Sequence, residues 1–334
     1  MVPPRSRSPF ASIIVLGILA FAAGCDKDAA RREAAQVVRP VGTPAINIFH
    51  RPTLLFQVYG DRADPRVLPV AAMIDSTVVA IGLNEYGWHA LDSLYFAPGT
   101  TLSLYHGGQP TGRATITRGM WTKDGALQTL PGCSAMRPLA AATLLTAGLD
   151  ADSAVELLAT SAPLTTRPAS RESFPSRDVL KVGRALGVDV ATHHGLAAED
   201  LDSLEFSAKA ISTGATGGLT VVASFLDAGA GDLGPGAGHS TSVLVLGEQV
   251  DGAWQPTYRH ASSGDARTVE FQRYLDHLDL DGDGIDEVLL EAWRYAGGNE
   301  LVILRFKAGQ WHEALRVPLG WCLDSPKTSG RARP

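Results

Sequence analysis

The chain has 334 residues, of which 45% are hydrophobic and 19% are charged, and its formal net charge at pH 7 is −6. This length leaves room for two domains with hydrophobic cores, and a mean hydropathy close to zero indicates a globular rather than a disordered chain. The negative charge and the lack of a basic stripe argue against a nucleic-acid partner, because phosphate binding depends on clustered lysine and arginine side chains.

The N-terminal segment predicts export from the cytoplasm. Arg5 and Arg7 precede an apolar run over residues 11–23, which is too short to span a bilayer as a mature helix. The run ends in Ala22-Ala23-Gly24-Cys25, which resembles the lipobox of bacterial lipoproteins, although that motif usually has leucine where Ala22 stands. The resemblance implies a signal peptide over residues 1–24 and lipidation of Cys25. It also implies an extracytoplasmic protein, anchored in the bacterial cell envelope and facing the periplasm or the cell surface. A plain secreted protein and an uncleaved anchor are the alternatives.

Residues 25–45 are polar and rich in alanine, with prolines near their end, and they predict a flexible tether between the lipid and the folded protein. Residues 46–148 predict an N-terminal β domain, in the form of a small antiparallel sandwich or barrel. Short β-branched or aromatic runs alternate there with turn pairs such as Asp-Pro, Pro-Gly and Gly-Gly. These runs cover residues 53–59, 76–83, 101–105 and 113–118.

Residues 149–203 predict a helical connection. We expect short helices over residues 138–148 and 153–159, and a longer one over residues 176–190, where apolar residues recur at helical spacing after the capping residue Ser176. The Thr-, Pro- and Ser-rich stretch 161–176 is the expected linker between the domains.

Residues 204–322 predict a second antiparallel β domain, followed by a disordered tail over residues 323–334. Asp251-Gly252 is a strong hairpin signal, and consecutive hairpins form a meander. The expected strands cover residues 220–226, 242–249, 253–259, 269–274, 287–295, 301–306 and 310–317. The expected fold class is therefore mainly β with a short helical connection (α+β), built from two antiparallel β domains.

The most informative stretch is DLDGDGIDE, residues 279–287. Carboxylates at alternate positions of a short loop repel one another unless a hard cation lies among them, and oxygen ligands at this spacing suit calcium. An EF-hand needs a glutamate at its twelfth position, which is Leu290 here, and the sequence that follows predicts a buried strand rather than a helix.

The stretch instead resembles the calcium loops of integrin-type (FG-GAP) and VCBS repeats. That resemblance implies five calcium ligands, which are the side chains of Asp279, Asp281, Asp283 and Glu287 and the main-chain carbonyl of Ile285. Gly284 would take the sharp turn. The upstream signatures of these repeats are missing and there is one copy of the loop, so the resemblance covers a local motif of structural character rather than a whole fold. The alternative is an acidic hairpin turn without a metal.

The remaining cysteines are Cys133 and Cys322. With Cys25 lipidated, an even pair in an oxidising compartment predicts one disulfide, which would join the C-terminal region to the N-terminal half. Two buried free thiols are the alternative.

Three stretches resemble catalytic or cofactor-binding motifs only in part. The glycines of residues 229–234 fit GxGxxG, but Pro-Gly and a strand follow them instead of the helix that a dinucleotide site needs. Residues 238–242 (GHSTS) approach the G-x-S-x-G nucleophile motif but lack its second glycine, and His260 and Asp265 are arbitrary partners for Ser240. The adjacent His193 and His194 lack zinc-ligand spacing.

Together these features predict a lipid-anchored, calcium-stabilised binding or interaction protein of the bacterial envelope, without enzymatic activity. Its ligand would be a protein or a carbohydrate, and the membrane would be contacted through the lipid. The alternatives are an envelope serine hydrolase that uses residues 238–242 and a structural envelope assembly lipoprotein.

Overall fold

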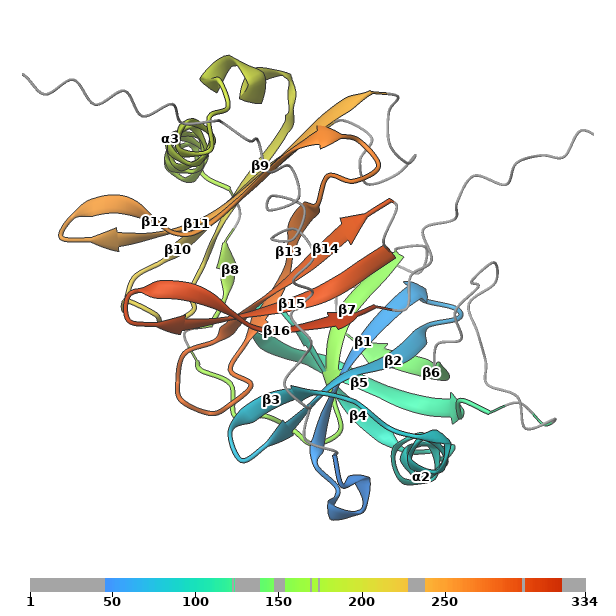
Figure 1. The fold of residues 1–334 in the computed structure, drawn as a ribbon. Helices are drawn as coiled ribbons and strands as arrows, with labels where there is room; N and C mark the ends of the chain where they lie inside the picture. The colour runs from blue at the N-terminus through green and yellow to red at the C-terminus, as the bar shows by residue number, and fades with distance from the viewer. Residues whose placement is uncertain are drawn as a thin grey trace, which may run out of the picture. The chain divides into compact units, whose positions relative to one another are not determined.

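The computed structural model describes residues 46–121, 123, 139–146, 154–168, 170–173, 175–227, 238–295 and 298–319. Residues 43–334 form one compact unit. It consists of three antiparallel sheets with short helical segments, which confirms the predicted mainly β fold class (Figure 1). In the part of the chain described, no helix is long and apolar enough to cross a membrane.

A seven-stranded sheet forms the N-terminal part, in the order β1-β7-β4-β5-β6-β2-β3. Strand β1 also pairs with β2, so the sheet closes on itself, in agreement with the predicted sandwich or barrel. Its strands are β1 (Thr53–Asp61), β2 (Arg66–Ile74), β3 (Thr77–Ala80), β4 (Thr101–His106), β5 (Gln109–Arg118), β6 (Ala140–Thr146) and β7 (Ala154–Thr160).

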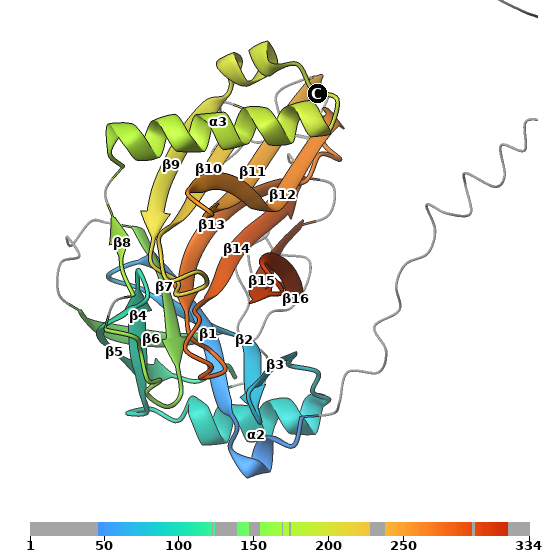
Figure 2. The same ribbon diagram turned by 90° about the vertical axis from the view of Figure 1, so that its left-hand side faces the viewer.

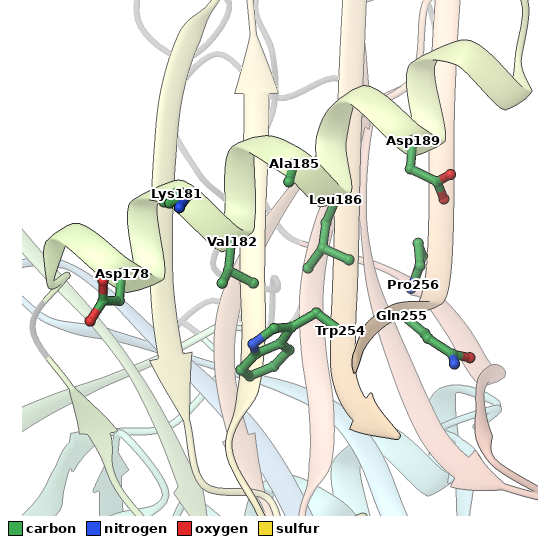
Figure 3. A pocket seen from close by; sticks show the side chains of 9 residues that line it. All are labelled: Asp178, Lys181, Val182, Ala185, Leu186, Asp189, Trp254, Gln255 and Pro256. Atoms are coloured by element: carbon green, nitrogen blue, oxygen red, sulfur yellow. The ribbon is translucent and has the colours of Figure 1, made fainter. Parts of the chain in front are cut away.

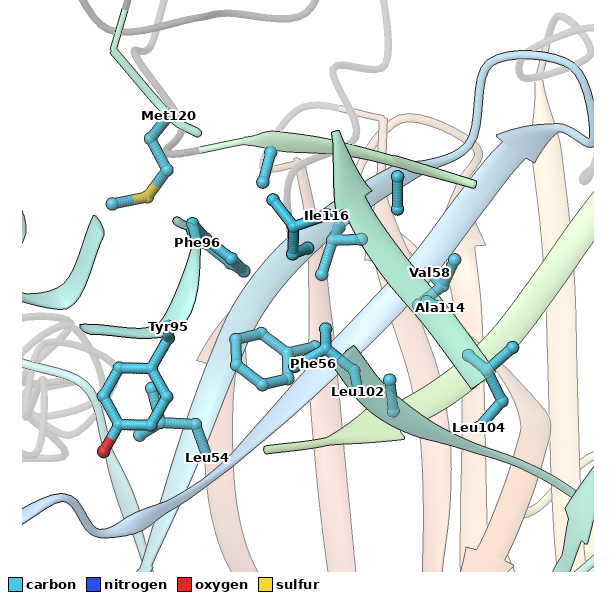
Figure 4. Close-up of a cluster of buried hydrophobic side chains, with 14 of the residues drawn as sticks. Leu54, Phe56, Val58, Tyr95, Phe96, Leu102, Leu104, Ala114, Ile116 and Met120 are labelled. Atoms are coloured by element: carbon cyan, nitrogen blue, oxygen red, sulfur yellow. The ribbon is translucent and has the colours of Figure 1, made fainter. Parts of the chain in front are cut away.

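The first hydrophobic core lies inside this sheet. Phe56 and Phe96 pack with their ring centroids 5.3 Å apart, among leucines of β1 and β4 (Figure 4). Helix α2 (Glu85–Tyr95), which is not among the predicted elements, contributes Leu91 and Tyr95 to the same core. The side chain of Asn84 caps this helix by accepting the N–H of Gly87 at 2.9 Å. A short 3-10 helix, η1 (Ile48–His50), precedes β1.

The helices predicted over residues 138–148 and 153–159 are wrong, because the chain forms β6 and β7 there. The reason is visible in β7. Leu157 packs into the core inside the sheet, whereas Leu158 packs into a second core on the other side. Neighbouring residues that face opposite cores require the two-residue period of a strand. The N-terminal sheet therefore continues beyond the expected domain boundary at residue 148.

The second sheet has five strands in the order β12-β11-β10-β9-β8. They are β8 (Glu172–Ser173), β9 (Glu205–Ile211), β10 (Thr220–Leu226), β11 (His239–Val250) and β12 (Ala253–Asp265). Helix α3 (Arg177–His193) lies across one face of this sheet, and η2 (Ala198–Ser203) follows it (Figure 2). Helix α3 confirms the helix predicted from residue 176. Its glycines allow close packing, because a Cβ atom on Gly187 would lie 2.1 Å from the ring of Phe225.

The strands of the predicted C-terminal meander, residues 204–322, belong to two sheets rather than one, because β9–β12 lie in the five-stranded sheet. The third sheet contains the later strands and is itself a meander of β13 (Phe271–Leu278), β14 (Glu287–Arg294), β15 (Gly298–Lys307) and β16 (Gln310–Pro318). Both of its faces are buried. Val288 and Leu290 pack against the five-stranded sheet, whereas Leu289 and Ile303 pack against the seven-stranded sheet. The meander is therefore the middle layer of the compact unit, and the loop that enters β14 connects to its centre.

Candidate metal centre

The acidic loop lies between β13 and β14. Gly282 and Gly284 adopt φ angles of 78° and 87°, a left-handed conformation that glycine adopts without steric cost. This agrees with the sharp turn expected at Gly284. The loop ends at Glu287, the first residue of the buried strand β14.

The structure brings Asp279, Asp281 and Asp283 together. One carboxylate oxygen from each residue lies within 4.8 Å of the other two. A calcium ion bound at roughly 2.3–2.6 Å holds opposite oxygens roughly 4.6–5.2 Å apart, so these three side chains fit such a coordination sphere. Asp279 is buried and Asp283 is exposed, so the group opens from the protein interior towards solvent. Such a group of carboxylates could hold a metal ion.

Backbone hydrogen bonds fix these carboxylates. Asp279 accepts the N–H groups of Gly282 and Gly284 at 2.7 and 3.1 Å, and Asp281 accepts the N–H of Asp283 at 3.0 Å. Asp283 in turn accepts the N–H of Ile285 at 2.8 Å. Because an ionised carboxylate has about four acceptor sites, each side chain keeps lone pairs for a cation.

Glu287 is buried beside the loop, and each of its carboxylate oxygens already accepts a hydrogen bond. Its Oε2 accepts the N–H of Leu280 at 2.8 Å, and its Oε1 accepts Nε of Arg305 at 3.2 Å. The same guanidinium forms an ion pair with Asp281 and so bridges the two acids. The fifth predicted ligand residue, Ile285, packs its side chain against the core between the second and third sheets.

The electrostatics of the loop favour a cation. Burial, with a smaller contribution from the negative charge of Asp281, raises the pKa of Glu287 to about 8. Burial also raises the pKa of Asp279, with a smaller contribution from Asp283 and Asp281. These groups resist ionisation as long as no cation compensates their charge.

A buried polar cluster beside the loop was missed by sequence reasoning. Asp286 is not part of the aspartate group, and it accepts a hydrogen bond from Ser170 Oγ at 2.5 Å. His277 is fully buried, with Nδ1 2.6 Å from the Tyr274 hydroxyl and Nε2 3.7 Å from Asp286. In the described part of the chain, His277 Nε2 and Asp286 Oδ1 have no hydrogen-bond partner. The sequence contains one signal for this cluster, which is Asp286, a carboxylate of the loop that the calcium motif does not use.

Burial dominates the ionisation of this cluster as well. It raises the pKa of Asp276 to about 7 and that of Asp286 to about 6. Burial, together with the positive charges of Arg167 and Lys209, lowers the pKa of His277 to about 3. The imidazole is therefore neutral at pH 7, and it can accept a hydrogen bond at one ring nitrogen and donate one at the other.

The residues considered for a serine hydrolase lie apart. Ser240 is buried in β11 opposite Gly264, whereas His260 pairs with Leu244, four positions further along the ladder, or roughly 13 Å. Nε2 of His260 is 3.0 Å from the carbonyl oxygen of Glu270, and burial lowers the pKa of His260 to about 4. His193 and His194 are exposed at the end of α3, and no residue spaced to share a zinc ion adjoins them in the sequence.

Other sequence predictions fall outside the described residues. These are the lipidation of Cys25, the disulfide between Cys133 and Cys322, the glycines of residues 229–234 and the tail over residues 323–334.

A hollow of about 650 Å³ lies between α3 and β12. The indole of Trp254 faces Val182 and Leu186, while Asp178 and Asp189 lie towards the two ends of the same helix face (Figure 3). Its size is typical of small-molecule and peptide sites. It therefore offers a surface of mixed polar and apolar character on the side of the molecule away from the meander.

No family model, curated protein or solved structure matches the chain.

Proposed function

We propose that this protein is a lipid-anchored, extracytoplasmic binding protein whose C-terminal meander is stabilised by one calcium ion, and that it catalyses no reaction. The convergence of Asp279, Asp281 and Asp283 at the entrance to a doubly buried strand carries the proposal. The donors are all hard oxygen atoms, which favours calcium or magnesium over zinc or copper. Calcium is favoured over magnesium because it accepts irregular sets of six to eight oxygen ligands, whereas magnesium demands a tighter octahedron.

In this proposal the three aspartates hold the ion, with the Ile285 carbonyl and the Glu287 carboxylate as further ligands. The ion neutralises their mutual repulsion and thereby ties the loop to the start of β14. Arg305 already supplies one positive charge to Asp281 and Glu287, so a cation has to compete with it. We therefore expect a weak affinity, roughly 10⁻⁵ to 10⁻³ M, in the range of extracellular calcium modules.

The remaining parts of the proposal rest on the sequence. Cys25 would carry the lipid, and residues 25–45 would hold the folded unit away from the membrane. The ligand would be a protein or a carbohydrate, for which the hollow beside Trp254 provides an aromatic face flanked by carboxylates. A disulfide between Cys133 and Cys322 would close a long loop and stabilise the fold in an oxidising compartment.

Isothermal titration of calcium into chelator-stripped protein tests the proposal directly. We expect one saturable site in the wild type and none in Asp281→Ala. Asp251→Asn is the matched control, because it removes one negative charge in the remote turn between β11 and β12 and asparagine tolerates its φ of 51°. Absence of saturable binding at millimolar calcium in the wild type would overturn the proposal.

A further inference from the structure

A second hollow, of about 580 Å³, lies where the first two sheets meet. It is bordered by the turn between β4 and β5 and by the strands β8 and β9. The polar residues that line it include His106, Gln109, Arg171, Glu172 and Lys209. Its volume falls in the range of sites for small molecules rather than for macromolecules.

The charge of this hollow differs from that of the chain as a whole. Arginine, lysine and histidine side chains outnumber its single acid, although the chain carries a net charge of −6. Lys209 Nζ lies 2.5 Å from Glu172 Oε1, so these two charges compensate each other. Within the described residues, the side chains of Arg171 and His106 form no hydrogen bond or ion pair. A guanidinium without a partner beside a hollow is suited to bidentate binding of a carboxylate, sulfate or phosphate group.

We propose that this hollow binds a small polar ligand through an oxyanion group, and that calcium at the acidic loop strengthens this binding. The second half of the proposal rests on the proposed calcium site. The oxyanion is a carboxylate, sulfate or phosphate, and Arg171 is its principal partner. The hollow is separate from the aspartate group, and the two are joined by the buried polar cluster.

One connection runs through Ser170. Its hydroxyl donates to Asp286 of the acidic loop at 2.5 Å, and its carbonyl accepts Nε2 of Gln109 at 2.6 Å. Gln109 lines the hollow, and Arg171 is the next residue in the chain after Ser170. Asp286 is therefore connected through Ser170 to the side chain of Gln109 and to the main chain next to Arg171, and both residues border the hollow.

A second connection runs through His277. Its ring lies between Asp286 and the Tyr274 hydroxyl, and Lys209 Nζ lies 4.7 Å above the centre of the Tyr274 ring. The residues between this cluster and the hollow are tightly packed, because a Cβ atom on Gly108 would lie 2.7 Å from His277 Nε2. Interiors packed this tightly transmit small displacements instead of absorbing them.

Isothermal titration with sodium sulfate and with sodium glucuronate, at constant ionic strength, tests the site. The two probes distinguish a free inorganic oxyanion from a carboxylate carried on a sugar ring. We expect saturable binding of at least one probe, weakened about tenfold or more in Arg171→Gln, since a charge-assisted bidentate contact is lost. Arg259→Gln is the matched control, because it removes an exposed arginine of β12 outside the hollow. Absence of binding by both probes, or equal binding by Arg171→Gln, would overturn the proposal.

The control by calcium is tested by repeating the titrations in calcium and in chelator. We expect calcium to raise the probe affinity by about 5-fold or more, and the probe to raise calcium affinity by the same factor, as linkage requires. Ser170→Ala and Tyr274→Phe each cut one connection without altering a calcium ligand. Both variants should still bind calcium, and the combined variant should show probe affinity independent of calcium. If the combined variant fails to fold, a reduced calcium effect in each single variant is the expected result.

The two proposals fail in different ways. If calcium binds but leaves probe affinity unchanged in the wild type, the coupling is wrong and the calcium site stands. If calcium does not bind while the probe binds in chelator and depends on Arg171, the calcium site is wrong and the oxyanion site stands.

Discussion

The substitution Asp283→Asn is the sharpest test of the metal centre. Asp283 is exposed, and the only described hydrogen bond of its carboxylate is the one that it accepts from the Ile285 N–H at 2.8 Å. The amide oxygen of asparagine can accept the same bond, so the loop keeps its conformation while it loses one negative charge. Asp281→Ala is less specific, because it also removes the ion pair with Arg305.

The size of the effect follows from ligand linkage. With a dissociation constant of about 10⁻⁴ M, calcium at about 2 mM stabilises the folded state by about 1.8 kcal/mol. For a compact unit that spans residues 43–334, the melting temperature should rise by about 3 °C. Loss of one charged ligand that weakens affinity about tenfold leaves about 0.6 kcal/mol of this stabilisation. In chelator the variant should match or exceed the wild type, because repulsion with Asp279 and Asp281 is relieved.

Thermal unfolding followed by circular dichroism, with calcium and in chelator, measures the calcium-induced rise in melting temperature and the stability without calcium. Asp251→Asn should keep the full calcium response, since it removes an equal charge far from the loop. A calcium response of equal size in Asp283→Asn and in the wild type would refute the reasoning, because the exposed carboxylate would then contribute nothing to a site.

Three further predictions concern pH, the lipid and the cysteines. In chelator, the folded protein retains a proton on Glu287 between its ordinary pKa and the raised value of about 8. Stability should therefore fall by up to about 1.4 kcal/mol per pH unit as pH rises through this window. Urea unfolding at several pH values should show that slope, and Glu287→Gln should reduce it. Intact-mass analysis of membrane-fraction protein should find a diacylglyceryl or triacylglyceryl adduct that disappears in Cys25→Ala, and an unmodified mass would refute the anchor. Non-reducing peptide mapping should join Cys133 to Cys322, and alkylation of both thiols in the native protein would contradict the bond.

The hairpins of the C-terminal half were predictable because their signals are local. Asp251-Gly252 forms the turn between β11 and β12, and Ala308 and Gly309, with positive φ angles, form the turn between β15 and β16. Strands β6 and β7 were not predictable by the same means. Their alanine and leucine runs suit a helix in isolation, and only the two cores on either side of β7 decide in favour of a strand.

In the candidate site, too, the features that depend on local sequence were predictable, and those that depend on tertiary contacts were not. Alternate spacing in one loop was enough to predict that Asp279, Asp281 and Asp283 converge. The position of Glu287 depends on Arg305, which arrives from the neighbouring strand β15, and this pairing has no signature in the loop. The partner of Asp286 is Ser170, 116 residues earlier in the chain, so only the tertiary structure reveals the buried cluster.

Charge balance at the head of β14 links the metal to the architecture. Asp279, Asp281, Asp283 and Glu287 carry four negative charges when ionised, and Arg305 supplies one positive charge, which leaves −3. Protonation of Glu287 reduces this to −2, and burial favours that state in the absence of a metal. A divalent cation reduces the fully ionised group to −1 without any proton. Calcium binding near neutral pH should therefore release a proton from this loop. Either the ion or the proton lowers the negative charge of these acids, and this lower charge lets them lie beside a strand that is buried on both faces.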